Sequence, residues 1–256
     1  MADLLIAILF ILGISAAGFK LKSLTLGGAA AAVFTGISIY AGFGYPGLIL
    51  LGVFFGSSSL WSKYKRNQKA SVEEMLVKGD QRDAIQVFAN GGAASLLSIL
   101  YAFFPFEGGF AVYSAAIAAA NADTWASEIG TLSRKKPRMI FSLKQVEKGT
   151  SGAVSVLGTA AAAAGSGLIA LCAYAVFALE PMEFYLIFLI GFAGNLIDTF
   201  LGAAVQVQFQ CPACGKTTEK KMHCDTEGEK IGGFLDNDAV NFTAILGAAL
   251  LVFLFY

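Results

Sequence analysis

Apolar stretches of the length that crosses a bilayer fill most of this sequence and constrain its fold more than any other feature. They run over residues 3–19, 24–42, 45–61, 84–104, 109–126, 151–179, 184–206 and 238–256. A helix of about 20 apolar residues spans the roughly 30 Å of hydrocarbon in a membrane. The chain is 14% charged, whereas a typical soluble domain is about 25% charged. The sequence therefore predicts an all-α, polytopic membrane helix bundle of about eight transmembrane helices.

The first stretch, residues 3–19, has the length of a secretory signal peptide. No basic residue precedes it, because the chain begins Met1-Ala2-Asp3. We therefore interpret this stretch as a retained transmembrane helix, with a cleaved signal peptide as the alternative.

The positive charges are confined to alternate connections between the stretches. All 18 lysines and arginines lie in four connections, as Lys20 and Lys22; Lys63, Lys65, Arg66, Lys69, Lys78 and Arg82; Arg134, Lys135, Lys136, Arg138, Lys144 and Lys148; and Lys216, Lys220, Lys221 and Lys230. Connections 42–47, 105–109 and 180–183 contain none. With eight crossings, the four cationic loops share one side, which the positive-inside rule assigns to the cytoplasm, and both termini lie outside. The net charge of zero implies no general attraction to nucleic acid.

The predicted cytoplasmic loops are much longer than the outer turns, and long loops beside a compact core are usually functional. No separate soluble domain is visible, so residues 1–256 are expected to form a single integral membrane domain with a cysteine-bearing cytoplasmic loop at 207–236. We expect a multi-pass integral membrane protein whose active face is cytoplasmic.

Polar residues in or beside the apolar stretches are the main candidates for a functional site, because an ionisable group inside a membrane costs roughly 3 kcal/mol or more. They form four clusters: Asn121, Asp123 and Glu128; Asn195 and Asp198; Asp238 and Asn241; and Arg82 with Asn90. Carboxylate and amide oxygens that share a helix face are suitable ligands for Mg²⁺. The alternative for each carboxylate is a helix cap, as for Asp236, or an interhelical hydrogen bond.

A glycine- and hydroxyl-rich turn, with the sequence EKGTSG at residues 147–152, opens the sixth stretch. Backbone N–H groups at a helix N-terminus bind anions, and Lys148 adds positive charge. We therefore expect Lys148, Gly149, Thr150 and Ser151 to contact phosphate. The alternative is that Thr150 or Ser151 only caps the helix, since the spacing differs from that of a P-loop.

These clusters are expected to meet at the cytoplasmic membrane boundary, where they suit a phosphorylated substrate and Mg²⁺. Carboxylates hold the metal in such sites, while Arg and Lys neutralise phosphate. An apolar substrate tail would lie between the helices, with its phosphate at the interface.

Four residues of the loop at 207–236 form a pattern that is typical of a zinc site. Cys211 and Cys214 form a CxxC-Gly turn, and the only histidine, His223, precedes Cys224. Two such pairs can close a tetrahedral structural Zn²⁺ site, which here would hold the loop and present Asp238 correctly. Since His223 and Cys224 are adjacent, it stays open whether both coordinate or a fourth ligand comes from elsewhere. A redox dithiol is the alternative, and Cys172 is interpreted as a core residue.

Five segments together resemble the transmembrane protein 19 family of integral membrane proteins, which includes the plant chloroplast phytyl-phosphate kinase. The segments are RDAIQVFANGG at 82–92, NADTWASE at 121–128, GTSG at 149–152, GNLIDT at 194–199 and DNDAVN at 236–241. The resemblance covers nearly the whole chain. It implies a phosphotransferase that moves a phosphoryl group from a nucleoside triphosphate, with CTP as the expected donor, to a phytyl- or polyprenyl-type isoprenoid monophosphate.

Under this hypothesis each polar cluster has a role in transfer. Asp123, Asp198 and Asp238, together with Glu128, bind Mg²⁺, while Asn121, Asn195 and Asn241 orient them or contact phosphate. Arg82, Lys148 and the turn at 149–152 hold the triphosphate, and Asn90 belongs to the same substrate-binding set. The attacking lipid phosphate is already anionic, so no general base is needed. The alternatives are a CTP-dependent cytidylyltransferase acting on a lipid phosphate, and a transporter or flippase for an anionic lipid.

Overall fold

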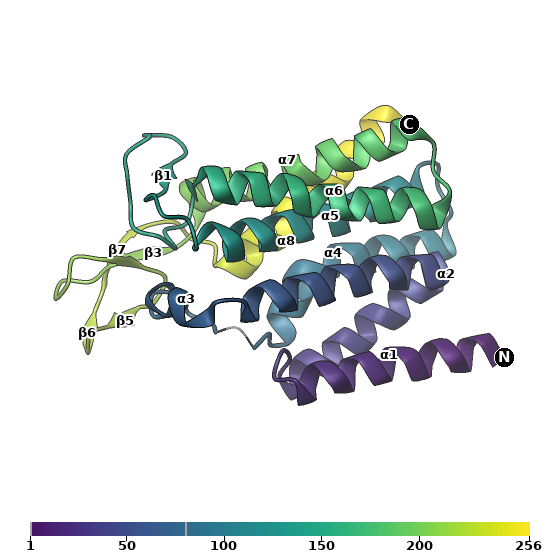
Figure 1. Ribbon diagram of the computed structural model, residues 1–256, viewed down its shortest axis with the longest axis horizontal. Coiled ribbons are helices and arrows are strands. Elements are labelled where there is room, and N and C mark those ends of the chain that lie inside the picture. The colour runs from purple at the N-terminus through teal and green to yellow at the C-terminus, as the bar shows by residue number, and fades with distance from the viewer. Residues whose placement is uncertain (1, 80) are drawn as a thin grey trace.

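The apolar stretches form the helices of a bundle in the computed structural model, which describes residues 2–79 and 81–256 (Figure 1). The helices are α1 (Ala2–Lys20), α2 (Leu26–Lys63), α3 (Arg66–Glu73), α4 (Ala84–Phe103), α5 (Gly109–Gly130), α6 (Val156–Phe177), α7 (Pro181–Val205) and α8 (Asn237–Leu251), followed by the 3₁₀ turn η1 (Val252–Phe255). Six helices of the described chain, namely α1, α2, α4, α6, α7 and α8 with η1, are long and apolar enough to span a membrane. The prediction of an all-α polytopic membrane bundle is confirmed.

Helix α2 consists of two segments that meet at Gly44, where the chain reverses direction (Figure 1). Gly44 has φ 61° and ψ −150°, a backbone conformation that is essentially restricted to glycine. The two segments match the predicted stretches at 24–42 and 45–61. The total of eight crossings stays a prediction.

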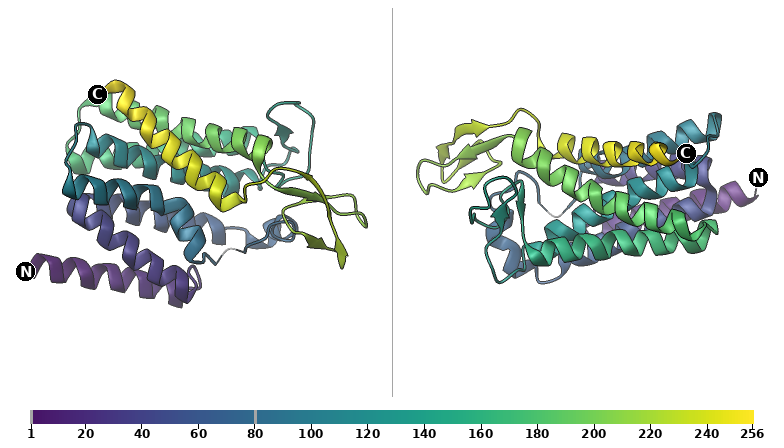
Figure 2. Two further views of the ribbon diagram at one scale, coloured as in Figure 1. Left: turned by 180° about the vertical axis from the view of Figure 1, so that it is seen from behind. Right: turned by 90° about the horizontal axis from the view of Figure 1, so that it is seen from above.

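Both chain termini lie at one end of the bundle, and the strands and α3 lie at the other (Figures 1 and 2). The turns at residues 44, 104–108 and 178–180 are at the end with the termini. The cationic connections are therefore together at the opposite end. This grouping is the one that the charge pattern predicted, while its assignment to the cytoplasm stays a prediction.

Helix α5 runs through the centre of the bundle and is covered on all sides. Every residue from Ala111 to Ala122 is buried. Neighbouring helices approach it closely through glycines: a Cβ atom added at Gly191 of α7 would lie 2.5 Å from Ala118 Cβ, and one at Gly194 would lie 2.5 Å from Ala119 Cβ. Small residues permit such approach between membrane helices. The polar end of α5 is thereby brought directly against α7.

Short strands, which the sequence did not indicate, structure two of the connections. Strands β1 (Arg138–Met139) and β2 (Ala153–Val154) pair antiparallel before α6. The loop between α7 and α8 contains β3 (Gln208–Gln210), β4 (Thr217–Thr218), β5 (Met222–His223), β6 (Thr226–Glu227) and β7 (Glu229–Gly232). They form a sheet with the order β4-β3-β7 and a hairpin of β5 with β6. The predicted cysteine-bearing loop is thus a small folded β arm.

Enlarging Gly191 tests the close contact of α5 and α7. We expect Gly191→Leu to destabilise the protein by about 1–3 kcal/mol, because the side chain would overpack a full interface. Thermal unfolding in detergent should show a melting temperature several degrees lower. The matched control is Gly247→Leu in α8, where an added Cβ meets nothing within 4 Å. Equal melting temperatures of the two variants would contradict this packing.

Candidate functional site

A cavity of about 630 Å³ opens at the end of the bundle that carries the cationic loops. It is enclosed by the ends of α2, α4, α5 and α7, the start of α8, helix α3, and the loop before α6. The lining includes all five predicted catalytic residues, Arg82, Asp123, Lys148, Asp198 and Asp238. It also includes Asn90, Glu128, Gly149, Thr150, Ser151, Asn195 and Asn241 from the predicted substrate-binding set. The structure thus brings together residues from five separate segments, while their catalytic roles stay predictions.

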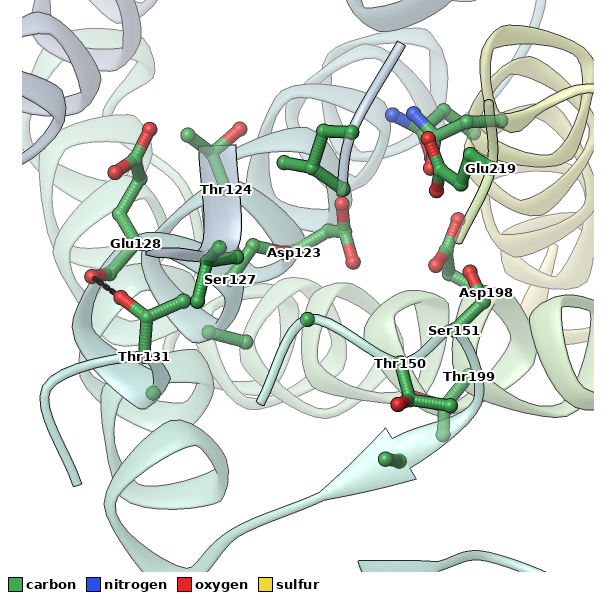
Figure 3. Close-up of a pocket in the computed structure, with 18 of the residues that line it drawn as sticks. Asp123, Thr124, Ser127, Glu128, Thr131, Thr150, Ser151, Asp198, Thr199 and Glu219 are labelled. Atoms are coloured by element: carbon green, nitrogen blue, oxygen red, sulfur yellow. Dashed lines mark hydrogen bonds between the residues drawn. The ribbon is translucent and has the colours of Figure 1, made fainter. Parts of the chain in front are cut away.

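Two carboxylates, Asp123 of α5 and Asp198 of α7, point toward each other in the cavity and lie close together (Figure 3). Asn195 Nδ2 donates a hydrogen bond to Asp123 Oδ1 at 3.1 Å. When the Asn241 amide is oriented so that its oxygen faces donors and its nitrogen faces acceptors, Nδ2 donates to Asp198 Oδ2 at 3.0 Å. Each amide holds one carboxylate and leaves that carboxylate a second oxygen. The two predicted asparagines therefore orient the two predicted acids.

Glu219 is a third acidic residue at this position, and sequence analysis missed it. Its carboxylate points toward Asp198 (Figure 3), although the residue belongs to the β arm. Gln206 Nε2 donates to Glu219 Oε1 at 2.7 Å, and the Glu219 backbone N–H donates to Met75 O at 3.1 Å. Burial raises the pKa of Glu219. No local signal separates Glu219 from the other charged residues of its loop, because only the fold of the arm brings it to the cavity.

Asp238 at the start of α8 is paired with a lysine that the sequence did not single out. Lys78 Nζ donates to Asp238 Oδ2 and lies 2.9 Å from Asp83 Oδ2. Burial opposes protonation of Lys78, but its hydrogen bonds with Asp238 and Asp83 outweigh burial and raise the pKa of Lys78. Lys78 therefore remains a cation at the cavity wall and joins the connection after α3 to α8.

Glu128 lies apart from the other acids, and both of its oxygens are already bound. Ser62 Oγ donates to Oε1 at 2.6 Å, and Lys69 Nζ donates to Oε2 at 2.6 Å. Lys69 is only 3% exposed, so the pair connects α3 to α5 in a buried place. This geometry favours a structural role for Glu128 over the predicted role as a magnesium ligand.

Asn121 is the one predicted substrate-binding residue that lies outside the cavity lining. It is fully buried, its Oδ1 accepts a hydrogen bond from Ser57 at 3.1 Å, and its Nδ2 donates to Gly165 O at 2.8 Å. These bonds join α5 to α2 and α6. Asn121 therefore has a position that suits a structural role, in which its hydrogen bonds hold the three helices together.

The glycine-rich turn lines the cavity, but the expectation that it opens a helix is wrong. Residues 149–152 precede strand β2, and α6 begins at Val156 with Ser155 as its N-cap. Gly152 has φ +75°, and a Cβ there would lie 2.3 Å from Ala203 Cβ. The glycine is thus needed for a close approach of the turn to α7. Any anion contact would use the N–H groups of the turn itself, since the helix N-terminus is farther along the chain.

Backbone pairing fixes Arg82 at the entrance to α4. Arg82 N donates to Ser23 O at 3.0 Å, and Thr25 N donates to Arg82 O at 3.0 Å. The Arg82 guanidinium lies 3.4 Å from Ser59 Oγ. The next residue, Asp83, forms a capping box with Gln86. Asp236 is likewise the N-cap of α8, as its alternative role foresaw.

The four predicted zinc ligands form a cluster at the tip of the β arm. The ligand atoms of Cys211, Cys214, His223 and Cys224 all lie within 4.8 Å of one another. His223 Nδ1 is 3.6 Å from Cys214 Sγ and 3.2 Å from Cys224 Sγ. Ligand atoms of a tetrahedral zinc site lie about 3.5–3.8 Å apart. Hydrogen bonding with His223 lowers the pKa of Cys211 to about 6, so this thiol favours the metal-binding thiolate form.

The chain resembles integral membrane proteins in comparisons with known families and sequences. Residues 9–249 match the family described as integral membrane protein DUF92. Protein PGR of Arabidopsis thaliana is 34% identical over 259 residues, which cover 89% of this chain and 87% of PGR. An uncharacterized membrane protein of Methanocaldococcus jannaschii is 40% identical over 167 residues, covering 64% of this chain and 66% of that protein. Protein VTE6, chloroplastic, of A. thaliana is 26% identical over 245 residues, covering 91% and 65%. No solved structure matches.

Substitution of Glu128 separates its structural role from metal binding. We expect Glu128→Gln to lower the free energy of unfolding by about 3 kcal/mol, because it leaves the buried Lys69 cation without its anion. The double variant Lys69→Met/Glu128→Gln should recover most of that loss in thermal unfolding, and with it the activity of the protein. The control is Glu147→Gln, which removes an exposed ion pair with Lys136 and should leave the melting temperature unchanged. A double variant that is stable but inactive would contradict the structural role and support Glu128 as a metal ligand.

Proposed function

We propose that this chain, which belongs to the DUF92 family of integral membrane proteins, is a CTP-dependent and Mg²⁺-dependent kinase that converts an isoprenoid monophosphate to the diphosphate. Family membership agrees with the resemblance to the transmembrane protein 19 family, and that resemblance supports a prenyl-phosphate kinase. The observation that carries the proposal is the convergence of Asp123, Asp198 and Glu219 in one cavity that Lys78 and Lys148 also line.

The acidic cluster supports a site for a divalent cation. Asp123, Asp198 and Glu219 lie close together in the cavity (Figure 3), and their like charges repel one another unless a cation is bound. Hard oxygen ligands suit Mg²⁺, which usually takes one or two carboxylates together with substrate phosphates. Asp123 and Asp198, held by Asn195 and Asn241, would be its ligands from the protein. When bound, the metal would neutralise charge on the phosphates.

The residues of the chain provide positioning and charge for the transfer. An oxygen of the isoprenoid monophosphate attacks the γ-phosphorus of CTP and forms a new P–O bond. The bond between the γ-phosphorus and the β–γ bridging oxygen breaks, and CDP leaves with that electron pair. Arg82, Lys78 and Lys148 would bind the phosphates, and the N–H groups of Gly149, Ser151 and Gly152 would supply further donors, while that of Thr150 donates to Glu147 O. Because the attacking phosphate is already anionic, no side chain has to remove a proton.

We further propose that the cluster at the tip of the β arm holds a structural Zn²⁺ ion. Its three cysteine thiolates and one histidine, arranged as the pairs Cys211/Cys214 and His223/Cys224, fit a closed tetrahedral site. Between these pairs, the Thr218 hydroxyl donates to Met75 O at 2.6 Å and Glu219 enters the cavity. A rigid arm would therefore keep Glu219 beside Asp198.

Turnover of purified protein tests the kinase proposal. Labelled CTP, Mg²⁺ and a panel of isoprenoid monophosphates in detergent should give labelled isoprenoid diphosphate. Asp123→Asn and Asp198→Asn should each lower the rate by about a hundredfold or more, because they remove charge from the metal site. Glu147→Gln, outside the cavity lining, is the matched control. A CDP-linked lipid would instead identify a cytidylyltransferase, and the absence of turnover would favour a transporter for an anionic lipid.

Metal analysis tests the zinc proposal independently of activity. We expect about one Zn²⁺ per chain in protein purified without chelators, and almost none in Cys214→Ser/Cys224→Ser, because thiolates are the main ligands. Cys172→Ser in α6 is the matched control and should keep the metal. Zinc that persists in the double variant, or wild-type protein without zinc, would reject the site.

A further inference from the structure

We propose that a groove between α1, α2 and α4 binds the apolar tail of the lipid phosphate and leads it to the cavity. This inference rests on the proposed function for the identity of the tail, an isoprenoid chain. The groove has a volume of about 80 Å³, so part of a long tail would lie in it and the remainder would lie in the surrounding lipid. It is lined almost entirely by apolar atoms, and it is separate from the 630 Å³ cavity.

The walls of the groove come from four helical segments. Helix α1 contributes Phe10, Ile11 and Ile14, and the first segment of α2 contributes Thr35 and Gly36. The second segment of α2 contributes a stripe at helical spacing: Leu48, Leu51, Gly52, Phe54, Phe55 and Ser58. Phe10 is 52% exposed and α1 lies at the edge of the bundle (Figure 1). The groove thus lies at the edge of the bundle, and a lipid tail would enter it sideways from the membrane past α1.

Three residues, Arg82, Gln86 and Asn90, line both the groove and the cavity, and the proposed junction of the two lies there. These residues lie at the first two turns of α4 and just before it. A ligand whose head lies in the cavity and whose tail lies in the groove would pass this point. The junction offers a cation and two amides, which match the phosphate–carbon boundary of a lipid monophosphate.

Two buried polar atoms at the groove lack a partner among the described residues, Thr35 Oγ1 and Asn90 Oδ1. Buried polar atoms are normally satisfied, so each such exception calls for an explanation. Asn90 uses its Nδ2 to donate to Gln86 O at 3.1 Å, which leaves its carbonyl oxygen at the junction. An amide oxygen is an acceptor and repels phosphate oxygens, so the Asn90 amide would contact a phosphate only through Nδ2.

The groove would position the substrate more than strengthen its binding. Lipid chains are as apolar as the groove, so little free energy is gained when the tail leaves the bilayer. A tail held along α2 would instead hold its phosphate near Arg82. Ser58 and Leu48 are ten residues apart, so the stripe is about 15 Å long at 1.5 Å per residue. Gly52 lies about 9 Å from Ser58 along the same axis.

Blocking the groove at Gly52 tests this inference. A Cβ atom added at Gly52 meets nothing within 4 Å, and Gly52 lines the groove, so the ring of Gly52→Phe would occupy groove space. We expect this variant to lower turnover of a C20 prenyl monophosphate by about tenfold or more. The blocked tail would shift the substrate, so that its phosphate no longer lies in the position for transfer. Turnover of a C5 prenyl monophosphate should be unchanged, because a C5 tail ends before Gly52. The matched control is Gly56→Phe, one turn along α2, which lines neither cavity and also meets open space.

Photo-crosslinking of wild-type protein separates this inference from the proposed function. The probe is a C20 prenyl monophosphate with a diazirine in its second isoprene unit. Crosslinks in residues 10–15, 48–55 and 87–91 support the groove whether or not the protein phosphorylates the probe. Crosslinks confined to α6, α7 and α8 would overturn it. Equal C20 turnover by Gly52→Phe and Gly56→Phe would also overturn it while leaving the kinase proposal intact, whereas wild-type protein that turns over neither substrate would reject the kinase alone.

Discussion

Enclosure of the polar helix α5 is the constraint on which the rest of the structure depends. A membrane offers no water to the fully buried Asn121, so its polar atoms must find partners inside the protein. The bundle meets this need by surrounding α5 and by allowing α7 and α6 to approach it through glycines. The same closeness sets Asp198 opposite Asp123. A requirement of membrane solvation thereby produces the acidic pair of the site.

Connections far apart in the sequence complete the cavity at the end of this core. Helix α3 is tied to α5 by Lys69 and Glu128, and the following connection is tied to α8 by Lys78 and Asp238. The β arm docks on that connection through Thr218 and Glu219. Each attachment pairs charges or satisfies backbone groups next to the cavity. The loops are therefore parts of the site, and a change in one is expected to reach the others.

The sequence predicted what depends on local pattern. Apolar length gave the long helices, and the restriction of the cations gave the grouping of loops at one end. Helical spacing also brought Asn195 and Asn241 into the predicted site. The sequence did not identify Lys78, because its partner Asp238 lies 160 residues away in the chain. It did not identify Glu219 either, because its contact with Gln206, 13 residues away, depends on the fold of the β arm. The prediction that the turn at 149–152 opens a helix was wrong because glycines are common at helix starts. Here Gly152 allows close contact with Ala203, and Gly149 allows close contact with Val72.

The groove and the cavity would together bind a molecule with two different parts, a charged phosphate head and an apolar tail. A phosphate needs donors, cations and water access, while a long tail needs an apolar path that avoids the same charges. The structure separates these environments, and Arg82, Gln86 and Asn90 line both of them. The Arg82 backbone is fixed by hydrogen bonds to Ser23 and Thr25 in the connection between α1 and α2. The helices that form the groove thus also hold the residue that would meet the phosphate, so that the position of the tail and the position of the reacting group are set by the same contacts.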